Sequence, residues 1–270
     1  MPELPEIRNL SMQISAEMAG KKIVTSEIRQ EKCLNVPVAE FEQLVTGKTI
    51  GNAYSRGKWI FMPLADDAVF LLNLGMGADT VLHKNGNSLP DKYQIKLGIS
   101  DGRVFTISFW WFGYAHVMPV SRLSEHAMTA SLGLDPLDSD GFSYETFARL
   151  VGSKKCKIKT LLTDQKLICG IGNVYIQDIL FRAGLHPDRK TSDISEKECK
   201  LLHRVIVENL SNALELGGLA YERDLHGVNG RFSEFLIGYR EGKPCPVCGT
   251  AIEKIKTGST ASFICPHCQR

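Results

Sequence analysis

The chain ends in Cys245-Pro-Val-Cys248, sixteen further residues, and then Cys265-Pro-His-Cys268. Two Cys-x2-Cys pairs at this separation are typical of a zinc site with four thiolate ligands, so we expect these four cysteines to bind one structural zinc ion. The metal replaces the hydrophobic core that a segment of about thirty residues cannot build. The sequence therefore predicts a zinc-finger β-hairpin over residues 241–270, either to contact nucleic acid or simply to stabilise the fold.

Length and composition limit the class of protein further. The chain has 270 residues, of which 43% are hydrophobic, enough for one large domain or two ordinary ones. No apolar run could span a membrane, and the acidic N-terminus lacks the apolar core of a signal peptide, which predicts a cytoplasmic protein. Residues 1–150 carry 14 Lys and Arg against 17 Asp and Glu, whereas residues 151–270 carry 18 against 13. A basic C-terminal part suits a polyanionic partner.

Hydrophobic periodicity predicts an α+β fold. Apolar residues at three- and four-residue steps indicate a helix over residues 3–19, and short β-rich runs between residues 23 and 119 indicate an antiparallel sandwich or barrel. Further helices are expected near residues 38–46, 144–152, 156–163, 173–183 and 195–216. We therefore expect an N-terminal helix and β-sandwich catalytic domain (1–130), a linker (131–142), a helical domain (143–240) and the zinc finger (241–270).

The N-terminal sequence Met1-Pro2-Glu3-Leu4-Pro5-Glu6 offers a nucleophile. Removal of Met1 would expose the secondary amine of Pro2, and an α-amine has a pKa of about 8, well below that of lysine. Such an amine can attack an aldehyde carbon to form a Schiff base, with Glu3 and Glu6 placed to exchange protons nearby. The alternative is structural, because proline also suits the first turn of a helix.

Several motifs, in order along the whole chain, resemble the formamidopyrimidine-DNA glycosylase / endonuclease VIII family. They are PELPE at residues 2–6, Gly57-Lys58 on an early strand, LGLDP in the linker, Ile158-Lys159-x-x-Leu162 before a glycine turn, Gly170-Ile-Gly172-Asn173 and the four-Cys finger. The resemblance implies a bacterial-type base-excision repair enzyme, a DNA glycosylase with AP-lyase activity. It also implies a helix–two-turns–helix element at roughly residues 156–184 and action as a monomer on damaged double-stranded DNA of the nucleoid.

The resemblance also implies roles for single residues. Pro2 would attack C1′ of the sugar, Glu3 would act as general acid and base, and Glu6 would support the site. Lys58 would hold a phosphate beside the lesion, and the strand would be cut by β,δ-elimination. Further DNA contacts would come from Lys159, Gly172 and Asn173, from Met76 inserted into the gap left by the flipped base, and from Phe112 stacked on the opposite strand.

Two positions depart from the family pattern. Thr260 stands where the family finger carries an arginine that grips the lesion phosphate, and Lys256 is the candidate cation to reach that phosphate instead. Trp110 stands where an arginine reads the base opposite the lesion, and its single donor cannot read a cytosine edge bidentately. We therefore expect weak selectivity for the opposite base and weaker or altered activity on 8-oxoguanine.

Two other functions remain open. The first is a damage-binding or abasic-site-binding family member without chemistry, which Thr260 favours. The second is a zinc-ribbon nucleic-acid module, which leaves the N-terminal motif unexplained.

Overall fold

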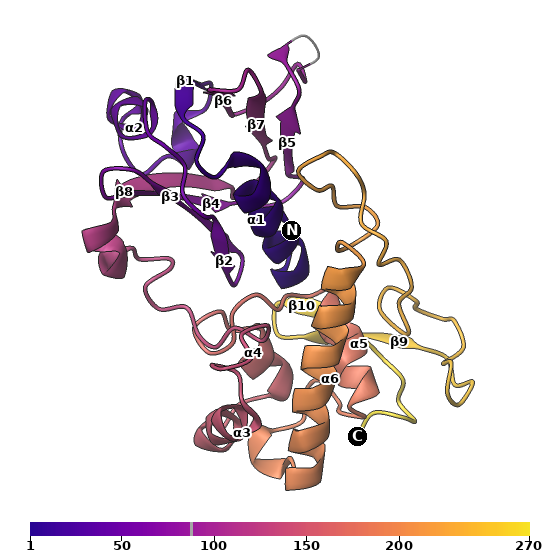
Figure 1. The fold of residues 1–270 in the computed structure, drawn as a ribbon. Helices are drawn as coiled ribbons and strands as arrows, with labels where there is room; N and C mark the ends of the chain where they lie inside the picture. The colour runs from indigo at the N-terminus through magenta and orange to yellow at the C-terminus, as the bar shows by residue number, and fades with distance from the viewer. Residues whose placement is uncertain (87–88) are drawn as a thin grey trace. The chain divides into compact units, whose positions relative to one another are not determined.

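The computed structural model describes residues 1–86 and 89–270, which divide into two compact units (Figure 1). Unit 1 comprises Met1–Ser131 and Leu216–Phe232, and unit 2 comprises Leu132–Glu215 and Ser233–Arg270. Residues 216–232 thus group with the N-terminal part, whereas the sequence predicts that they belong to the helical domain. The reason is that Leu225 is fully buried in the core of unit 1, and its carbonyl accepts from Leu82 N at 2.9 Å.

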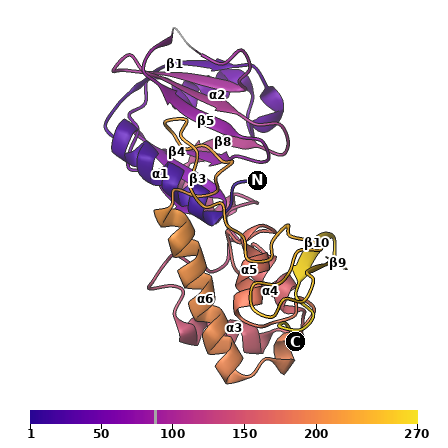
Figure 2. The same ribbon diagram turned by 90° about the vertical axis from the view of Figure 1, so that its right-hand side faces the viewer.

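Unit 1 consists of two antiparallel sheets with helices packed on them (Figures 1 and 2). One sheet has the order β1-β6-β7-β5 and the other the order β2-β3-β4-β8. The strands are β1 (Ile23–Ile28), β2 (Tyr54–Arg56), β3 (Trp59–Leu64), β4 (Ala68–Asn73), β5 (Asp79–His83), β6 (Ile95–Ile99), β7 (Val104–Ser108) and β8 (Tyr114–Pro119). The helices are α1 (Leu4–Met18), α2 (Val38–Val45) and the short 3-10 turns η1 (Glu31–Cys33) and η3 (Val120–Glu125). The N-terminal helix and the antiparallel sheets confirm the architecture predicted for this part.

The helix α1 is placed by its apolar face. Ile7, Leu10, Ile14 and Met18 are each at most 2% exposed, and the helix lies against β2 and β3. Burial of four such side chains contributes on the order of 6 kcal/mol or more. This packing carries the N-terminus to the edge of the sheet β2-β3-β4-β8.

Unit 2 is helical apart from one hairpin. Its helices are α3 (Tyr144–Ser153), α4 (Ile158–Thr163), α5 (Tyr175–Arg182), the short η4 (Thr191–Asp193) and α6 (Glu196–Glu215). The strands β9 (Glu253–Thr257) and β10 (Thr260–Ile264) form the C-terminal hairpin, and α5 contacts both α6 and β10. Among the described residues, no helix combines the length and apolarity needed to cross a lipid bilayer.

Candidate active site and nucleic-acid interface

The N-terminal segment of unit 1 buries two carboxyl groups beside the start of α1. Pro2 is buried, Glu3 is 2% exposed and Glu6 is 4% exposed. Glu3 is the residue that precedes the helix, and its backbone N–H donates to Glu6 Oε2 at 2.8 Å. This arrangement fixes the backbone of Glu3, and therefore the position of Pro2, before any substrate binds.

Glu6 ties the N-terminus to residues 216–232. Its second oxygen, Oε1, accepts from the backbone N–H of Leu219 at 3.0 Å. The approach is close because Gly218 has no side chain: a Cβ at this position would lie 2.8 Å from Glu6 Cγ, and its φ of 88° also favours glycine. Both Glu6 oxygens thus accept backbone hydrogen bonds, which indicates that Glu6 positions the N-terminus.

A third carboxyl group, which the sequence analysis missed, lies at the same place. Glu222 Oε1 is 3.9 Å from the α-amino nitrogen of Met1, and the Glu222 side chain is only 12% exposed. Burial raises the pKa of Glu222, the positive α-amine lowers it and the neighbouring Glu3 raises it again. Nothing in the sequence could reveal this approach, because more than two hundred residues separate Glu222 from Met1.

Lys58 lies in a turn, which corrects the prediction that it lies on a strand. Arg56 pairs with Trp59, so Gly57 and Lys58 form the two-residue connection between β2 and β3. The φ of 57° at Gly57 suits the first position of a type II′ hairpin turn. Asn73, at the end of β4, donates its side-chain amide to the Lys58 carbonyl at 2.9 Å and holds the turn at this edge of the sheet.

The loop after β4 and the loop before β8 meet at the same edge. Met76 N donates to the carbonyl of Trp111 at 2.9 Å, and Trp110 N donates to the carbonyl of Met76 at 2.9 Å. A Cβ on Gly75 would lie 2.1 Å from the Trp111 oxygen, so only glycine permits this approach. The predicted loop position of Met76 is therefore found, and its backbone is locked to the aromatic segment.

These loops expose large apolar side chains. Trp110 is 82% exposed, Trp111 62%, Phe112 67% and Met76 42%. Phe112 adopts a φ of 56°, an uncommon conformation for an aromatic residue that the bridge to Met76 maintains. Exposed apolar groups on a fixed backbone are suited to insert between bases.

In unit 2 the predicted glycine turn precedes α5. Gln165 clamps it, since its Oε1 accepts from Gly170 N and its Nε2 donates to the Ile171 carbonyl, each at 2.8 Å. The helix begins at Tyr175, two residues later than predicted, because Asn173 still belongs to the turn. Gln177, also missed from the sequence, donates its Nε2 to Asn173 Oδ1 at 3.2 Å, which occupies the side-chain oxygen of Asn173.

Lys159, Asn173 and Thr260 line one cavity of about 400 Å³ at the tip of the β9–β10 hairpin. Lys159 itself is 4% exposed, and its Nζ donates to Thr260 Oγ1, to the Ala261 carbonyl and to Ser262 Oγ at 2.8–2.9 Å. Burial lowers the pKa of Lys159 to about 8. The ammonium thus has three acceptors within the hairpin, which indicates that Lys159 orders the finger.

Lys256 is exposed on β9 and does not line this cavity. It pairs with Ala261, whereas Thr257 pairs with Thr260, so Lys256 and Thr260 point to opposite faces of the hairpin. The hydroxyl of Thr260 accepts a hydrogen bond from Lys159, and not from Lys256 on the other face.

The four predicted zinc ligands come together. Their sulfur atoms lie within 4.8 Å of one another, with Cys248 and Cys265 at 3.4 Å and Cys245 and Cys268 at 3.9 Å. Tetrahedral zinc with Zn–S bonds of about 2.3 Å requires S–S separations of about 3.8 Å, so the cluster fits this metal.

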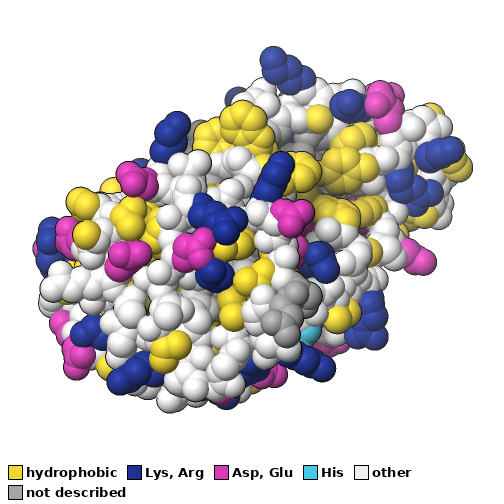
Figure 3. All heavy atoms as spheres, turned by 90° about the horizontal axis from the view of Figure 1, so that it is seen from above, with side chains coloured by type: hydrophobic (Ala, Val, Ile, Leu, Met, Phe, Trp, Pro, Cys, Tyr) yellow, Lys and Arg dark blue, Asp and Glu magenta, His cyan; other side chains and the backbone are white. Residues whose placement is uncertain are grey.

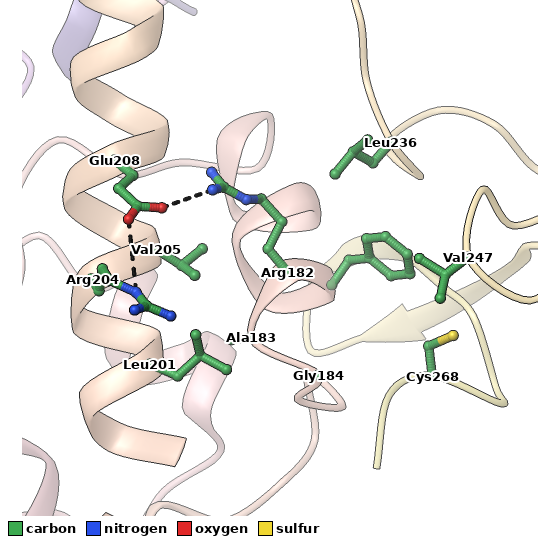
Figure 4. A pocket seen from close by; sticks show the side chains of 11 residues that line it. Arg182, Ala183, Gly184, Leu201, Arg204, Val205, Glu208, Leu236, Val247 and Cys268 are labelled. Carbon is green, nitrogen blue, oxygen red and sulfur yellow. Dashed lines mark hydrogen bonds and ion pairs between the residues drawn. The ribbon is translucent and has the colours of Figure 1, made fainter. Parts of the chain in front are cut away.

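A second cavity of unit 2, about 520 Å³, lies between α5, α6 and the finger (Figure 4). Its charged lining is internally paired, because Glu208 accepts from Arg182 at 2.8 Å and lies 3.7 Å from Arg204 Nε. On the face drawn in Figure 3, acidic and basic side chains are interspersed, without a field of one sign.

Comparison with known families matches three successive parts of the chain. Residues 1–108 match the formamidopyrimidine-DNA glycosylase N-terminal domain, and residues 132–223 match the formamidopyrimidine-DNA glycosylase H2TH domain. Residues 242–270 match the zinc finger found in FPG and IleRS. Together with the sulfur cluster, the last match shows that the chain carries one structural zinc site.

Curated and solved relatives cover the whole chain. The formamidopyrimidine-DNA glycosylase of Cytobacillus firmus is 32% identical over all of both chains, and that of Oceanobacillus iheyensis is 33% identical over 100% of this chain and 98% of its own. Lactococcus lactis Fpg bound to DNA with an abasic site superposes with a TM-score of 0.90, at 26% identity over 99% of both chains. The same enzyme bound to DNA with N7-benzyl-Fapy-dG superposes with a TM-score of 0.91, at 26% identity over all of both chains.

Proposed function

The chain belongs to the formamidopyrimidine-DNA glycosylase family, and from this premise we propose that Pro2 is the nucleophile of its reaction on damaged DNA. It is a DNA glycosylase and AP lyase that acts on damaged bases and abasic sites, with DNA as its partner. The observation that carries the proposal is the buried cluster at the N-terminus, where the Glu3 backbone is fixed by Glu6. Removal of Met1 leaves the Pro2 amine as the leading group of this cluster.

The proposed chemistry follows from the amine. Its lone pair attacks C1′, the bond from C1′ to the damaged base breaks, and the electron pair leaves with the base, which takes up the proton that the amine nitrogen loses. Glu3 supplies a proton to the sugar ring oxygen as the ring opens, and the resulting iminium acidifies C2′–H for β-elimination. A second elimination would give the β,δ product. Glu6 acts through backbone positions, because both its oxygens accept from N–H groups.

We further propose how DNA is held. Lys58 and the Gly172-Asn173 turn would contact phosphates, and Gln177 supports this role for Asn173 by occupying its side-chain oxygen. Met76 and Phe112 would fill the space left by the flipped nucleotide, as their exposure and locked backbone allow. Trp110 would stack without reading the opposite base, and the substrate range would include lesions other than 8-oxoguanine.

Borohydride trapping on DNA with an abasic site tests the nucleophile. Protein whose intact mass shows the loss of Met1 is expected to give a covalent adduct. Pro2→Gly and a form that retains Met1 are expected to form the adduct at least about 1,000-fold more slowly than the trimmed wild type, because the secondary amine is absent or blocked. Pro37→Gly, which changes a proline before α2, is the matched control and should behave as the wild type.

The opposite result would decide for another function. Tight binding of abasic DNA by correctly trimmed protein without any adduct would indicate a damage-binding protein, which the loss of a guanidinium at Thr260 favours. We also propose a monomer that acts on nucleoid DNA in a bacterial cytoplasm, supported by the bacterial origin of the relatives. Sedimentation of the free protein would test the oligomeric state.

A further inference from the structure

Glu222 has no part in the reaction as described so far, yet it lies against the α-amine of Met1, the residue directly before Pro2. Its Oε1 is 3.9 Å from the Met1 amine, and Glu3 is close enough to raise its pKa. Glu222 therefore interacts with the residue before Pro2 and with the residue after it. The Glu222 backbone is fixed as well, since its N–H donates to the Leu219 carbonyl at 3.0 Å and its carbonyl accepts from Gly230 N at 3.1 Å.

The chemistry of proline makes a counter-ion necessary at this place. A primary amine forms an imine that can lose its proton and become neutral. A secondary amine such as that of Pro2 forms an iminium nitrogen with no proton to lose, so the adduct stays cationic until elimination or hydrolysis. Pro2 is buried, and an unpaired cation in a buried site costs several kcal/mol.

We propose that Glu222 is the counter-ion of the N-terminal amine and of the iminium that this amine forms with the sugar. This inference rests on the proposed role of Pro2 as the nucleophile. Glu222 is then a positioning residue that stabilises positive charge on the reacting nitrogen. No bond to Glu222 forms or breaks, and no proton needs to leave it.

Glu6 and Arg223, the neighbouring charged groups, already have partners, so Glu222 and Glu3 are the carboxyl groups that can compensate positive charge on the amine. Both Glu6 oxygens accept backbone hydrogen bonds from Glu3 and Leu219. The adjacent Arg223 is paired with Asp79 at 2.8 Å, so its charge is compensated away from Glu222. Burial, the largest influence, raises the pKa of Glu222, and the positive α-amine opposes that rise, so the carboxylate and the amine stabilise each other's charged forms at 3.9 Å.

The test compares the pH dependence of the amine in trimmed wild type, Glu222→Gln and Glu222→Asp. Reductive alkylation by a small aldehyde without DNA, followed by mass spectrometry of the N-terminal peptide, reports how much amine is unprotonated at each pH. Loss of the carboxylate should lower the midpoint of this titration by about one pH unit, the lower end of the shift that an opposite charge produces at this range. Glu222→Asp should keep the wild-type midpoint, as should Glu40→Gln, an exposed glutamate of α2.

Borohydride trapping on abasic DNA then gives the second readout. At about pH 10.5, where the amine is largely unprotonated in each variant, Glu222→Gln should accumulate about tenfold less adduct because its iminium has lost a counter-ion. An unchanged midpoint together with wild-type adduct yield would overturn the inference, and so would an equal shift in Glu40→Gln. If the midpoint shifts but wild type forms no adduct on DNA, the proposed nucleophile fails while the pairing of Glu222 with the amine stands.

Discussion

The N-terminal site of unit 1 and the finger hairpin of unit 2 both bury charge, but of opposite sign. At the N-terminus, Glu6 is held by two backbone N–H groups. In the hairpin, Lys159 is held by two hydroxyls and a carbonyl. Buried charge is tolerated in both places because each group has hydrogen-bond partners.

The two regions differ in what the buried charge can do. The Glu222 carboxyl group lies beside the terminal α-amine, close enough to Glu3 for the two carboxyl groups to interact, and the charge of the amine changes during the proposed reaction. The ammonium of Lys159 gathers oxygen atoms that undergo no chemistry. A buried charge therefore indicates catalysis only where it faces a reacting atom, and otherwise indicates a structural tie.

Removal of zinc should give the largest difference between the two regions, because it should disrupt the finger and leave the N-terminal site unchanged. Chelation, or Cys265→Ser, is expected to unfold the finger and to weaken DNA binding at least about 100-fold, because the metal supplies the folding energy of such a module. The rate at which the N-terminal amine is alkylated should stay within about twofold of the wild-type rate, since the contacts of Glu6 and Glu222 are made within unit 1. Equilibrium DNA titrations and the alkylation assay measure the two effects.

The control for zinc removal is Cys156→Ser, which changes a half-buried cysteine outside the metal cluster. It should retain DNA binding. Loss of amine reactivity along with the finger would contradict the independence of the two regions.

Replacement of the buried ammonium is expected to have the next largest effect. Lys159→Met removes three hydrogen bonds and should weaken DNA binding about tenfold and destabilise unit 2 by about 2 kcal/mol at neutral pH. Chemical denaturation and DNA titration measure both values. Lys166→Met, at an exposed lysine of the same unit, should change neither.

The pH dependence of stability gives a sharper version of this test. The folded pKa of Lys159 is about 8, below the value of about 10.4 for an unfolded lysine. The unfolded chain therefore binds more protons between these values, and stability rises with pH across this window. The difference in unfolding free energy between wild type and Lys159→Met should increase by up to about 3 kcal/mol from pH 7.5 to pH 10.5. A flat difference would mean that the hydrogen bonds fully offset the burial of charge.

The smallest expected effect concerns the exposed loops of unit 1, where no charge is buried. Wild type should excise a lesion opposite C, A, G and T at rates within about threefold, because Trp110 offers one donor. Trp110→Arg should raise the preference for C about tenfold by restoring a bidentate donor. Trp111→Arg, at the neighbouring exposed position, is the matched control. Strong preference for C in wild type would refute the role assigned to Trp110.

Much of the fold could be predicted because its signals are local. The step of apolar residues from Ile7 to Met18 predicted α1 to within about one residue, and the cysteine spacing predicted the metal cluster. The prediction that Lys58 lies on a strand is wrong. The apolar residues after it resemble a strand, and a turn of only two residues does not interrupt the hydrophobic pattern visibly. The sequence places residues 216–232 with the helical domain because their ties to unit 1, among them the burial of Leu225 and the hydrogen bond from Leu219 to Glu6, join segments far apart in the chain.

The sequence by itself determined the helices, the strands, the zinc ligands and the nucleophile candidate, since each depends on residues near one another in the chain. Only the tertiary structure decided which charged groups meet. Glu222 reaches the N-terminus and Lys159 reaches the finger across separations of 221 and about 100 residues. Such meetings depend on how elements pack, and packing couples distant segments through burial that no local pattern records.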